Sequence, residues 1–394
     1  MLFPNPNLEA ERAPRGLVAL CCFVFFSNII QFGVFRDFPL FQLSVFLLAL
    51  FICFFRRVFI DSLLLIVIGF VFFVCIFALL LNFNAYNFLA YSFFCFSVVV
   101  VYGVGAKYNN YGIASFLGLF VAMSLAFMIF SLSEGFSIYR FSGFFDNPNG
   151  MGRFAAWTML ISLLSILVLP NYCKSKVSVT FFVFTASLSC VLLLASNSRL
   201  SIGSLVFSFL ATSLLYIFRR VLLLSFRRSS LYKAFWGLLL FFCLTFVLYK
   251  FGFFDDLIFK FASTLDSGDF TQGRTARWED ALPYLSLFGQ GHDIYSRSGL
   301  SEVHSNYIGQ VLVFGWISAI AIYTLIFFMF FKSMYCFLAS GFYGYIMAFA
   351  LFCFYFFYSL FETGFAILPI YLAIFFLGFS DSLLKTNKNK ADSI

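Results

Sequence analysis

The chain has 394 residues, of which 62% are apolar and only 11% are charged, and its formal net charge is +8. Roughly a quarter of the residues of soluble proteins are charged, so this composition excludes a soluble enzyme, a nucleic-acid-binding protein and a disordered scaffold. The mean hydropathy of +0.98 and the 66 phenylalanines indicate a chain solvated largely by lipid.

The polar residues lie in short gaps between apolar stretches, each about as long as a helix that crosses roughly 30 Å of hydrocarbon. In lipid every backbone polar group needs an internal partner, so these stretches must be helices. We therefore predict an all-α polytopic membrane protein with about twelve transmembrane helices. The predicted spans are 16–34, 38–55, 59–81, 86–105, 111–132, 153–170, 177–195, 200–218, 234–250, 304–331, 335–358 and 363–380.

The lysines and arginines predict the orientation, because cytoplasmic loops carry the excess of these residues. Placing the N-terminus inside puts most of them, Lys332 included, on the cytoplasmic side. Both termini are then cytoplasmic. We predict one membrane domain over residues 1–394, with one larger periplasmic loop at 251–303. Because the cytoplasmic loops already account for the positive charge, we predict no nucleic-acid partner.

The first long outward segment contains a dense turn signal at residues 146–150. Pro148 moves Asn147 away from helical dihedral angles, and Asn149 with the following glycine can supply positive φ. We expect a sharp turn here, with the next helix beginning just after it. An outward helix N-terminus attracts anions, and Arg153 in its first turn adds a full charge. The alternative is a simple turn with a snorkelling arginine.

Residues 196–199, Ser-Asn-Ser-Arg, interrupt an apolar run that continues on both sides. Arg199 must lie near the outer membrane boundary or face the bundle interior. An arginine in such a place usually has a partner or a function, and a guanidinium binds phosphate oxygens in pairs. A snorkelling loop arginine is again the alternative.

In the larger loop, residues 273–282 indicate a short amphipathic helix that ends before Pro283. Arg274 and Arg277 are three residues apart and share a face of that helix, while Trp278 suits the headgroup layer. The glycines of residues 289–291 then break the helix. An ordinary interfacial helix is the alternative interpretation.

The two histidines, His292 and His304, both fall at the outer edge. His304 directly precedes the tenth predicted span. A neutral imidazole at the lip of a helical bundle can accept a proton from a sugar hydroxyl. A solvated loop histidine is the alternative. No second histidine stands at ligand spacing, and the adjacent Asp255 and Asp256 do not share a face, so we predict no metal site.

Together, the outer side presents arginines on separate segments and one histidine at the entrance of a span. These arginines are Arg140, Arg153, Arg199, Arg274 and Arg277. The combination fits a substrate with a pyrophosphate leaving group and an acceptor hydroxyl, because guanidinium groups stabilise the departing charge and a base activates the attacking oxygen. A lipid tail on the substrate would explain why this chemistry lies in a bilayer.

Three stretches resemble the O-antigen ligase and O-antigen polymerase family of bacterial envelope glycosyltransferases. They are Arg-Phe-Ser-Gly-Phe-Phe-Asp-Asn-Pro-Asn-Gly at 140–150, Ser-Asn-Ser-Arg at 196–199, and the run from Gly273 through Trp278 and Gly-Gln-Gly at 289–291 to His-Ser-Asn-Tyr-Ile at 304–308 and Gly315. Their order, and their positions after the fifth, seventh and ninth spans, match the family pattern over the region 135–330.

The resemblance implies a GT-C-like enzyme of the bacterial inner membrane that takes a glycan from undecaprenyl pyrophosphate at the periplasmic face, without a metal or other cofactor. In the family pattern, Arg199 and either Arg274 or Arg277 match the pyrophosphate-binding arginines, and His304 matches the acceptor-activating histidine. Leu200 stands where the family often has glycine, which leaves the type of acceptor open.

The leading hypothesis is an O-antigen ligase, whose acceptor is the lipid A core, acting by a single inverting displacement. A polymerase would use a second lipid-linked glycan as acceptor. A lipid-linked sugar transporter is more distant, because transporters place charges near the midplane of several spans. A non-catalytic assembly partner would need no histidine.

Overall fold

The computed structural model describes residues 61–81, 85–108, 110–137, 140–145, 147–168, 176–223, 274–291, 293–362 and 368–391, together with 18–22, 25, 45, 250, 259 and 262. Every regular element in these ranges is a helix, which confirms the all-α prediction. The elements are α3 (Ser62–Leu81), α4 (Ala85–Gly105), α5 (Asn110–Leu132), α6 (Pro148–Val168), α7 (Lys176–Ser196), α8 (Arg199–Leu222), α11 (Arg274–Ala281), the 3₁₀ helix η2 (Leu282–Tyr284), α12 (Ile294–Ser298), α13 (Asn306–Ser340), α14 (Tyr343–Ser359) and α15 (Leu368–Ala391).

Each predicted span from 59–81 to 200–218, and from 304–331 to 363–380, corresponds to one of these helices. The spans 16–34, 38–55 and 234–250 lie almost wholly outside the described residues. Within the described ranges, four helices are long and apolar enough to cross a membrane: Gly112–Leu132, Val179–Ser196, Arg199–Leu222 and Asn306–Ser340. The fold is therefore that of an α-helical membrane protein.

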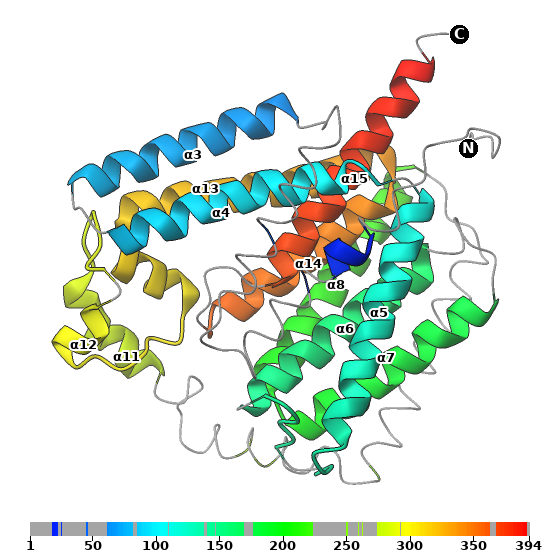
Figure 1. Cartoon of the computed structure of the whole chain (residues 1–394), viewed down its shortest axis with the longest axis horizontal. Helices are drawn as coiled ribbons and strands as arrows, with labels where there is room; N and C mark the ends of the chain where they lie inside the picture. Colours follow the sequence, from blue (N-terminus) through cyan, green and yellow to red (C-terminus); the bar gives the residue numbers. More distant parts are fainter. Residues whose placement is uncertain are drawn as a thin grey trace.

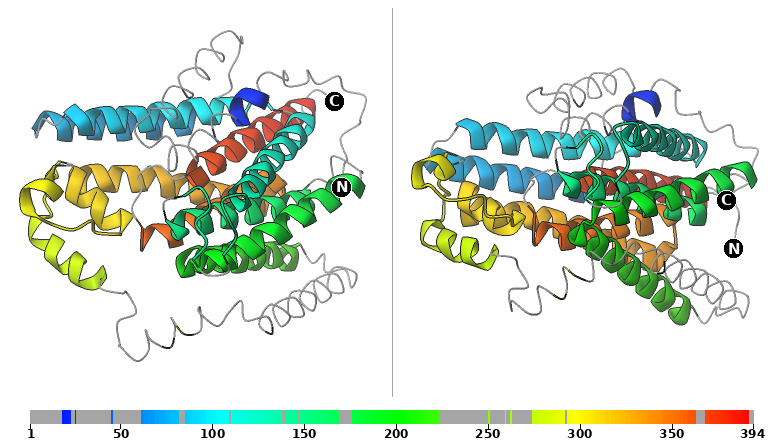
Figure 2. Two further views of the ribbon diagram at one scale, coloured as in Figure 1. Left: turned by 60° about the horizontal axis from the view of Figure 1, so that its bottom comes forward. Right: turned by 90° about the horizontal axis from the view of Figure 1, so that it is seen from below.

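α14 lies between two groups of helices (Figure 1 and Figure 2). It packs against α8 on one side and against α13 and α15 on the other. α6 packs against α5, α7 and α8, while α3, α4 and α13 form the opposite group. Nearly every side chain of α14 is buried, so its C-terminal end is a point where both groups meet.

The boundary predicted between the spans 304–331 and 335–358 is wrong. α13 continues to Ser340 and ends at Gly341, whose left-handed φ of 72° terminates it. Lys332 therefore lies inside a helix rather than in a loop. Its charge is tolerated there because its ammonium group pairs with Asp61, which directly precedes α3, and with Asp381 of α15.

Further contacts extend this charged cluster. The Lys332 Nζ lies 2.7 Å from the Asp381 Oδ2. The hydroxyl of Tyr345 donates to Asp381 Oδ1 at 2.6 Å, and the hydroxyl of Tyr102 donates to Asp381 Oδ2. The cluster thus joins α4, α13, α14, α15 and the start of α3 at the end of the bundle where α14 begins.

α13 is kinked at Gly315, whose φ of 85° and ψ of 163° are not helical. The segment 286–291 pairs with the backbone that the kink exposes: Trp316 N donates to Ser286 O at 3.1 Å, and Gly291 N donates to Val313 O at 3.0 Å. Non-helical backbone at membrane depth is tolerated only where protein satisfies it in this way. The kink therefore fastens the segment 286–291 to α13.

Candidate functional site

The segment that precedes α6 lies against the end of α7. Phe141 N donates to Ala195 O at 2.9 Å. The preceding Arg140 is exposed and has a positive φ of 53°. Arg140 is thereby held beside the residues that lead into the turn at 196–199.

The turn at residues 146–150 differs from its prediction. Asn149 and the following glycine have helical conformations, because α6 begins at Pro148. Proline suits the first position of a helix, where no N–H partner is needed. The side chain of Asn147 accepts a hydrogen bond from Asn149 N at 2.8 Å, as a capping residue does. The turn thus precedes the proline.

The first turns of α6 pack directly on the α7–α8 connection. A Cβ atom on Gly152 would overlap the side chain of Ser198, so only glycine permits this approach. The neighbouring Arg153 is half-buried, and its guanidinium carbon lies 5.4 Å from the ring centroid of Trp157 and 5.7 Å from that of Tyr358. The guanidinium group of Arg153 therefore lies between Trp157 of α6 and Tyr358 at the end of α14.

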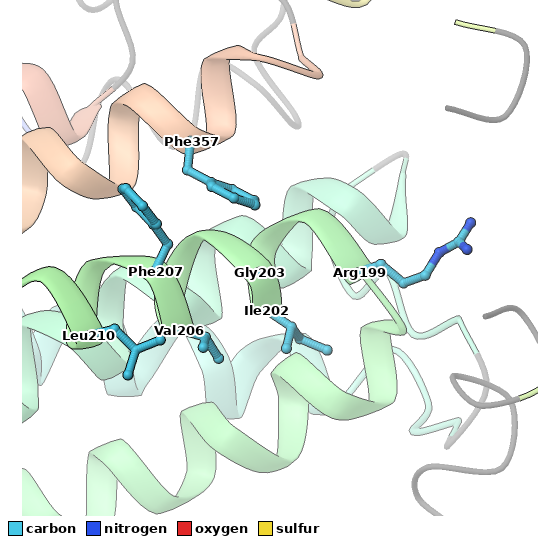
Figure 3. Close-up of a pocket in the computed structure, with 7 residues that line it drawn as sticks. All are labelled: Arg199, Ile202, Gly203, Val206, Phe207, Leu210 and Phe357. Atoms are coloured by element: carbon cyan, nitrogen blue, oxygen red, sulfur yellow. The ribbon is translucent and has the colours of Figure 1, made fainter. Parts of the chain in front are cut away.

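The connection that carries Arg199 is as short as predicted. α7 ends at Ser196 and α8 begins at Arg199, with Asn197 at a positive φ of 55°. The side chain of Arg199 is half-buried and projects beyond the end of α8 (Figure 3). Arg274 of α11 lies within electrostatic range of it. Two guanidinium groups so placed repel each other, and a bound anion would offset that repulsion.

Tyr358, in the last turn of α14, lies among the charged residues of the candidate site. Arg153, Arg274 and Glu362 all lie within electrostatic range of its hydroxyl group. Arginines from α6, α8 and α11 are thus brought together at one end of the bundle, although they are far apart in the sequence.

His304 directly precedes α13 and has a positive φ of 48°. Its Nδ1 lies 3.5 Å from Oε2 of Glu362, and the two side chains are 32% and 16% exposed. Glu362 was not among the predicted site residues. The signal in the sequence was an isolated acid between two apolar helices, the kind of residue that usually has a function.

The residues after His304 fix it against α14. Asn306 is buried, and its Nδ2 donates to the hydroxyl of Tyr355 at 2.7 Å. The hydroxyl of Tyr307 donates to Phe356 O at 3.1 Å. The sequence Ser-Asn-Tyr thus joins the start of α13 to the end of α14.

α11 runs from Arg274 to Ala281, one residue shorter at each end than predicted, and braces the segment before His304. Arg277 Nη1 donates to Glu302 O at 3.4 Å, and Trp278 Nε1 donates to Val303 O at 2.9 Å. The Trp278 ring stacks on Phe361 with 6.3 Å between centroids. Trp278 therefore packs against Phe361 and against the segment that precedes His304. The two arginines of α11 also differ: Arg277 contacts backbone, whereas Arg274 faces Arg199.

A small apolar cluster joins this loop to the start of α13. Ala281, Ile294, Val303 and Leu312 are buried together, and Tyr295 packs against them. Burial raises the pKa of Tyr295 to about 12, and the nearby Glu302 carboxylate adds to the rise. Tyr295 is thus neutral and structural.

Three non-glycine residues in the described ranges have positive φ: Arg140, Asn197 and His304. Each belongs to a different one of the three sequence motifs. Such conformations are costly and concentrate at functional sites. The second histidine, His292, and the loop residues 251–273 other than 259 and 262 lie outside the described residues.

No protein-family model matches the chain, and no curated protein matches its sequence.

Proposed function

We propose that the protein is a membrane glycosyltransferase of the O-antigen ligase type, which moves a glycan from undecaprenyl pyrophosphate to an acceptor hydroxyl. The observation that carries this proposal is the gathering of Arg153, Arg199 and Arg274 around the end of α14, next to the pair formed by His304 and Glu362. The cations suit a diphosphate leaving group, and the imidazole suits an acceptor hydroxyl.

In the proposed reaction, Arg199 and Arg274 bind the diphosphate and stabilise the charge that develops as it departs. Because Nδ1 of His304 faces Glu362, its Nε2 is the nitrogen that accepts the proton of the acceptor hydroxyl. The acceptor oxygen attacks the anomeric carbon, the bond from that carbon to the phosphate oxygen breaks, and the configuration inverts.

We further propose a GT-C-like arrangement of about twelve spans in the bacterial inner membrane, with both termini cytoplasmic and the reaction at the periplasmic face. The acceptor is the lipid A core in this proposal. Polymerisation with a second lipid-linked glycan as acceptor is the alternative, since it has the same donor and leaving group.

Glycan transfer by the purified protein in nanodiscs tests the proposal, with an undecaprenyl-pyrophosphate-linked glycan as donor. We expect Arg199→Ala and His304→Ala each to lower kcat/KM by about 100-fold or more, since each removes a group that acts in the transition state. Arg220→Ala is the control, because Arg220 lies in the last turn of α8, at the opposite end from Arg199, and its Nη2 donates to the hydroxyl of Tyr216 in the same helix at 2.7 Å.

The same assay with a lipid A core or with a second lipid-linked glycan identifies the acceptor from the product. A chelator should leave the rate unchanged. Wild-type turnover in both Arg199→Ala and His304→Ala would show that the proposed reaction centre is wrong.

A further inference from the structure

Residues 281–291, in the loop between α11 and α12, contain no charged side chain. We call them the apolar loop segment. Acids flank the segment on both sides, the nearest being Asp280 and Asp293. Three of its large side chains are exposed, namely Leu282 at 56%, Tyr284 at 37% and Leu287 at 59%. Exposed apolar side chains that gather in this way mark a surface that contacts something apolar.

The backbone of the apolar loop segment is bonded within the protein. The Gln290 Nε2 donates to Tyr284 O at 3.1 Å, and Gly289 N donates to the hydroxyl of Ser286 at 2.9 Å. Gln290 N donates to Leu312 O of α13 at 2.9 Å. Irregular backbone is tolerated at membrane depth only where protein satisfies its polar groups, so these bonds suit the segment to contact with lipid.

The segment also continues an apolar stripe on α13. From Trp316 to Phe331, the exposed side chains of α13 recur every three or four residues and none is charged: Trp316, Ile320, Thr324, Phe327 and Phe331. This spacing defines one face of a helix, which in a membrane-spanning helix is the face toward lipid. Ile317 N donates to Leu287 O at 3.3 Å. Leu287 therefore lies beside the first residues of the stripe.

The length of α13 gives the depth of the segment. The helix has 35 residues and measures about 52 Å along its axis, whereas roughly 30 Å of hydrocarbon needs only about 20 residues. The stripe ends at Phe331, because the charged Lys332 follows it. Counting about 20 residues back from Phe331 reaches Leu312. The backbone of Leu287 pairs with residue 317, which lies inside that boundary.

We propose that the apolar loop segment dips into the bilayer leaflet nearest the candidate site, with Leu282 and Leu287 among the acyl chains. Tyr284 and Trp316 suit the headgroup boundary, where both residue types are enriched. Continuity with the stripe of α13 identifies the partner as membrane lipid. Side chains of an interfacial segment reach roughly 5–10 Å below the headgroups. The loop that carries α11, which packs beside α13 (Figure 2), is thereby anchored at a fixed height in the membrane.

Site-directed photocrosslinking tests this placement and does not depend on the proposed reaction. The photoreactive amino acid p-benzoylphenylalanine replaces Leu287, and the protein is irradiated in nanodiscs of phosphatidylethanolamine and phosphatidylglycerol. Leu287 is exposed, so the replacement disturbs no core packing. We expect a phospholipid adduct by mass spectrometry, about tenfold or more above that from the same replacement at Arg297, because acyl chains are excluded from water.

Two positions serve as matched controls. Ile320 of the stripe is also 59% exposed and should give a phospholipid adduct. Arg297 lies in the charged part of the same loop, with its side chain 59% exposed, and should give almost none.

Three outcomes would overturn the proposal. A phospholipid adduct at position 320 without one at 287 would place the segment in water. A crosslinked dimer in place of the phospholipid adduct at 287 would identify the surface as an interface between two copies of the chain. Equal phospholipid adducts at 287 and 297 would show that no single segment of the loop enters the bilayer.

Discussion

The pairing of His304 with Glu362 shows how a single contact assigns different tasks to the two nitrogens of a histidine. A carboxylate beside Nδ1 favours the tautomer with its proton on that nitrogen, which leaves Nε2 free to act as a base. Glu362 is then a positioning residue, since it acts through the imidazole.

We expect Glu362→Gln to lower kcat about 10-fold to 100-fold with little change in KM, as loss of a carboxylate behind a working histidine does. The glutamine side chain carries no charge, so it cannot stabilise the protonated imidazole of His304 as the carboxylate does. Steady-state kinetics of glycan transfer would measure both constants, with Glu302→Gln as the control, because Glu302 contributes its backbone carbonyl to Arg277. A rise in KM with unchanged kcat would contradict the positioning role.

At the scale of elements, the site depends on how α13 is joined to the loop that carries α11 and the segment 286–291. The loop backbone from Ser286 to Gly291 bonds to α13 on either side of Gly315. The same loop carries α11, whose Trp278 holds the backbone carbonyl of Val303 just before His304. The kink at Gly315 lies beyond the first turns of α13. It nevertheless helps to position His304, because it joins α13 to the loop that holds Val303.

Gly315→Ala should destabilise the protein by about 3 kcal/mol or more, because its φ and ψ belong to a region that only glycine adopts readily. A Cβ atom there would also overlap the backbone of residues 287–289. Thermal unfolding in detergent would measure the effect. Gly69→Ala is the control: Gly69 lies in α3 with no atom near its missing Cβ, and alanine should be neutral or stabilising by up to about 1 kcal/mol. Equal Tm values for the two variants would refute the role of the kink.

For the whole molecule, the two ends of α14 have different tasks. Tyr358 at its C-terminal end faces the arginines, while Tyr345 near its N-terminal end belongs to the cluster of Lys332 and Asp381. The two tyrosines are roughly 20 Å apart along the helix. The cluster holds the helices together at the end opposite the candidate site.

Lys332→Met should destabilise the protein by about 3–5 kcal/mol, since it leaves the buried Asp381 without its cation. The double variant Lys332→Met with Asp381→Asn should recover part of this loss, because it removes the stranded charge as well. Thermal unfolding measures both, and Lys385→Met on the exposed part of α15 is the control. In the folded fraction KM should be unchanged, since the cluster lies far from the site. A double variant no more stable than Lys332→Met would contradict the ion-pair account.

The helical fold and most helix positions could be predicted from the sequence, because lipid leaves a spanning backbone no other way to satisfy its polar groups. The three motifs were also visible, since arginine, asparagine and histidine stand out in an apolar chain. The packing of the helices could not be predicted, because helices that are apolar on every side carry no pattern that shows which face meets a neighbour. Only the tertiary structure therefore decided that Glu362 faces His304, that Arg274 rather than Arg277 faces Arg199, and that Lys332 lies within α13, paired with two acids.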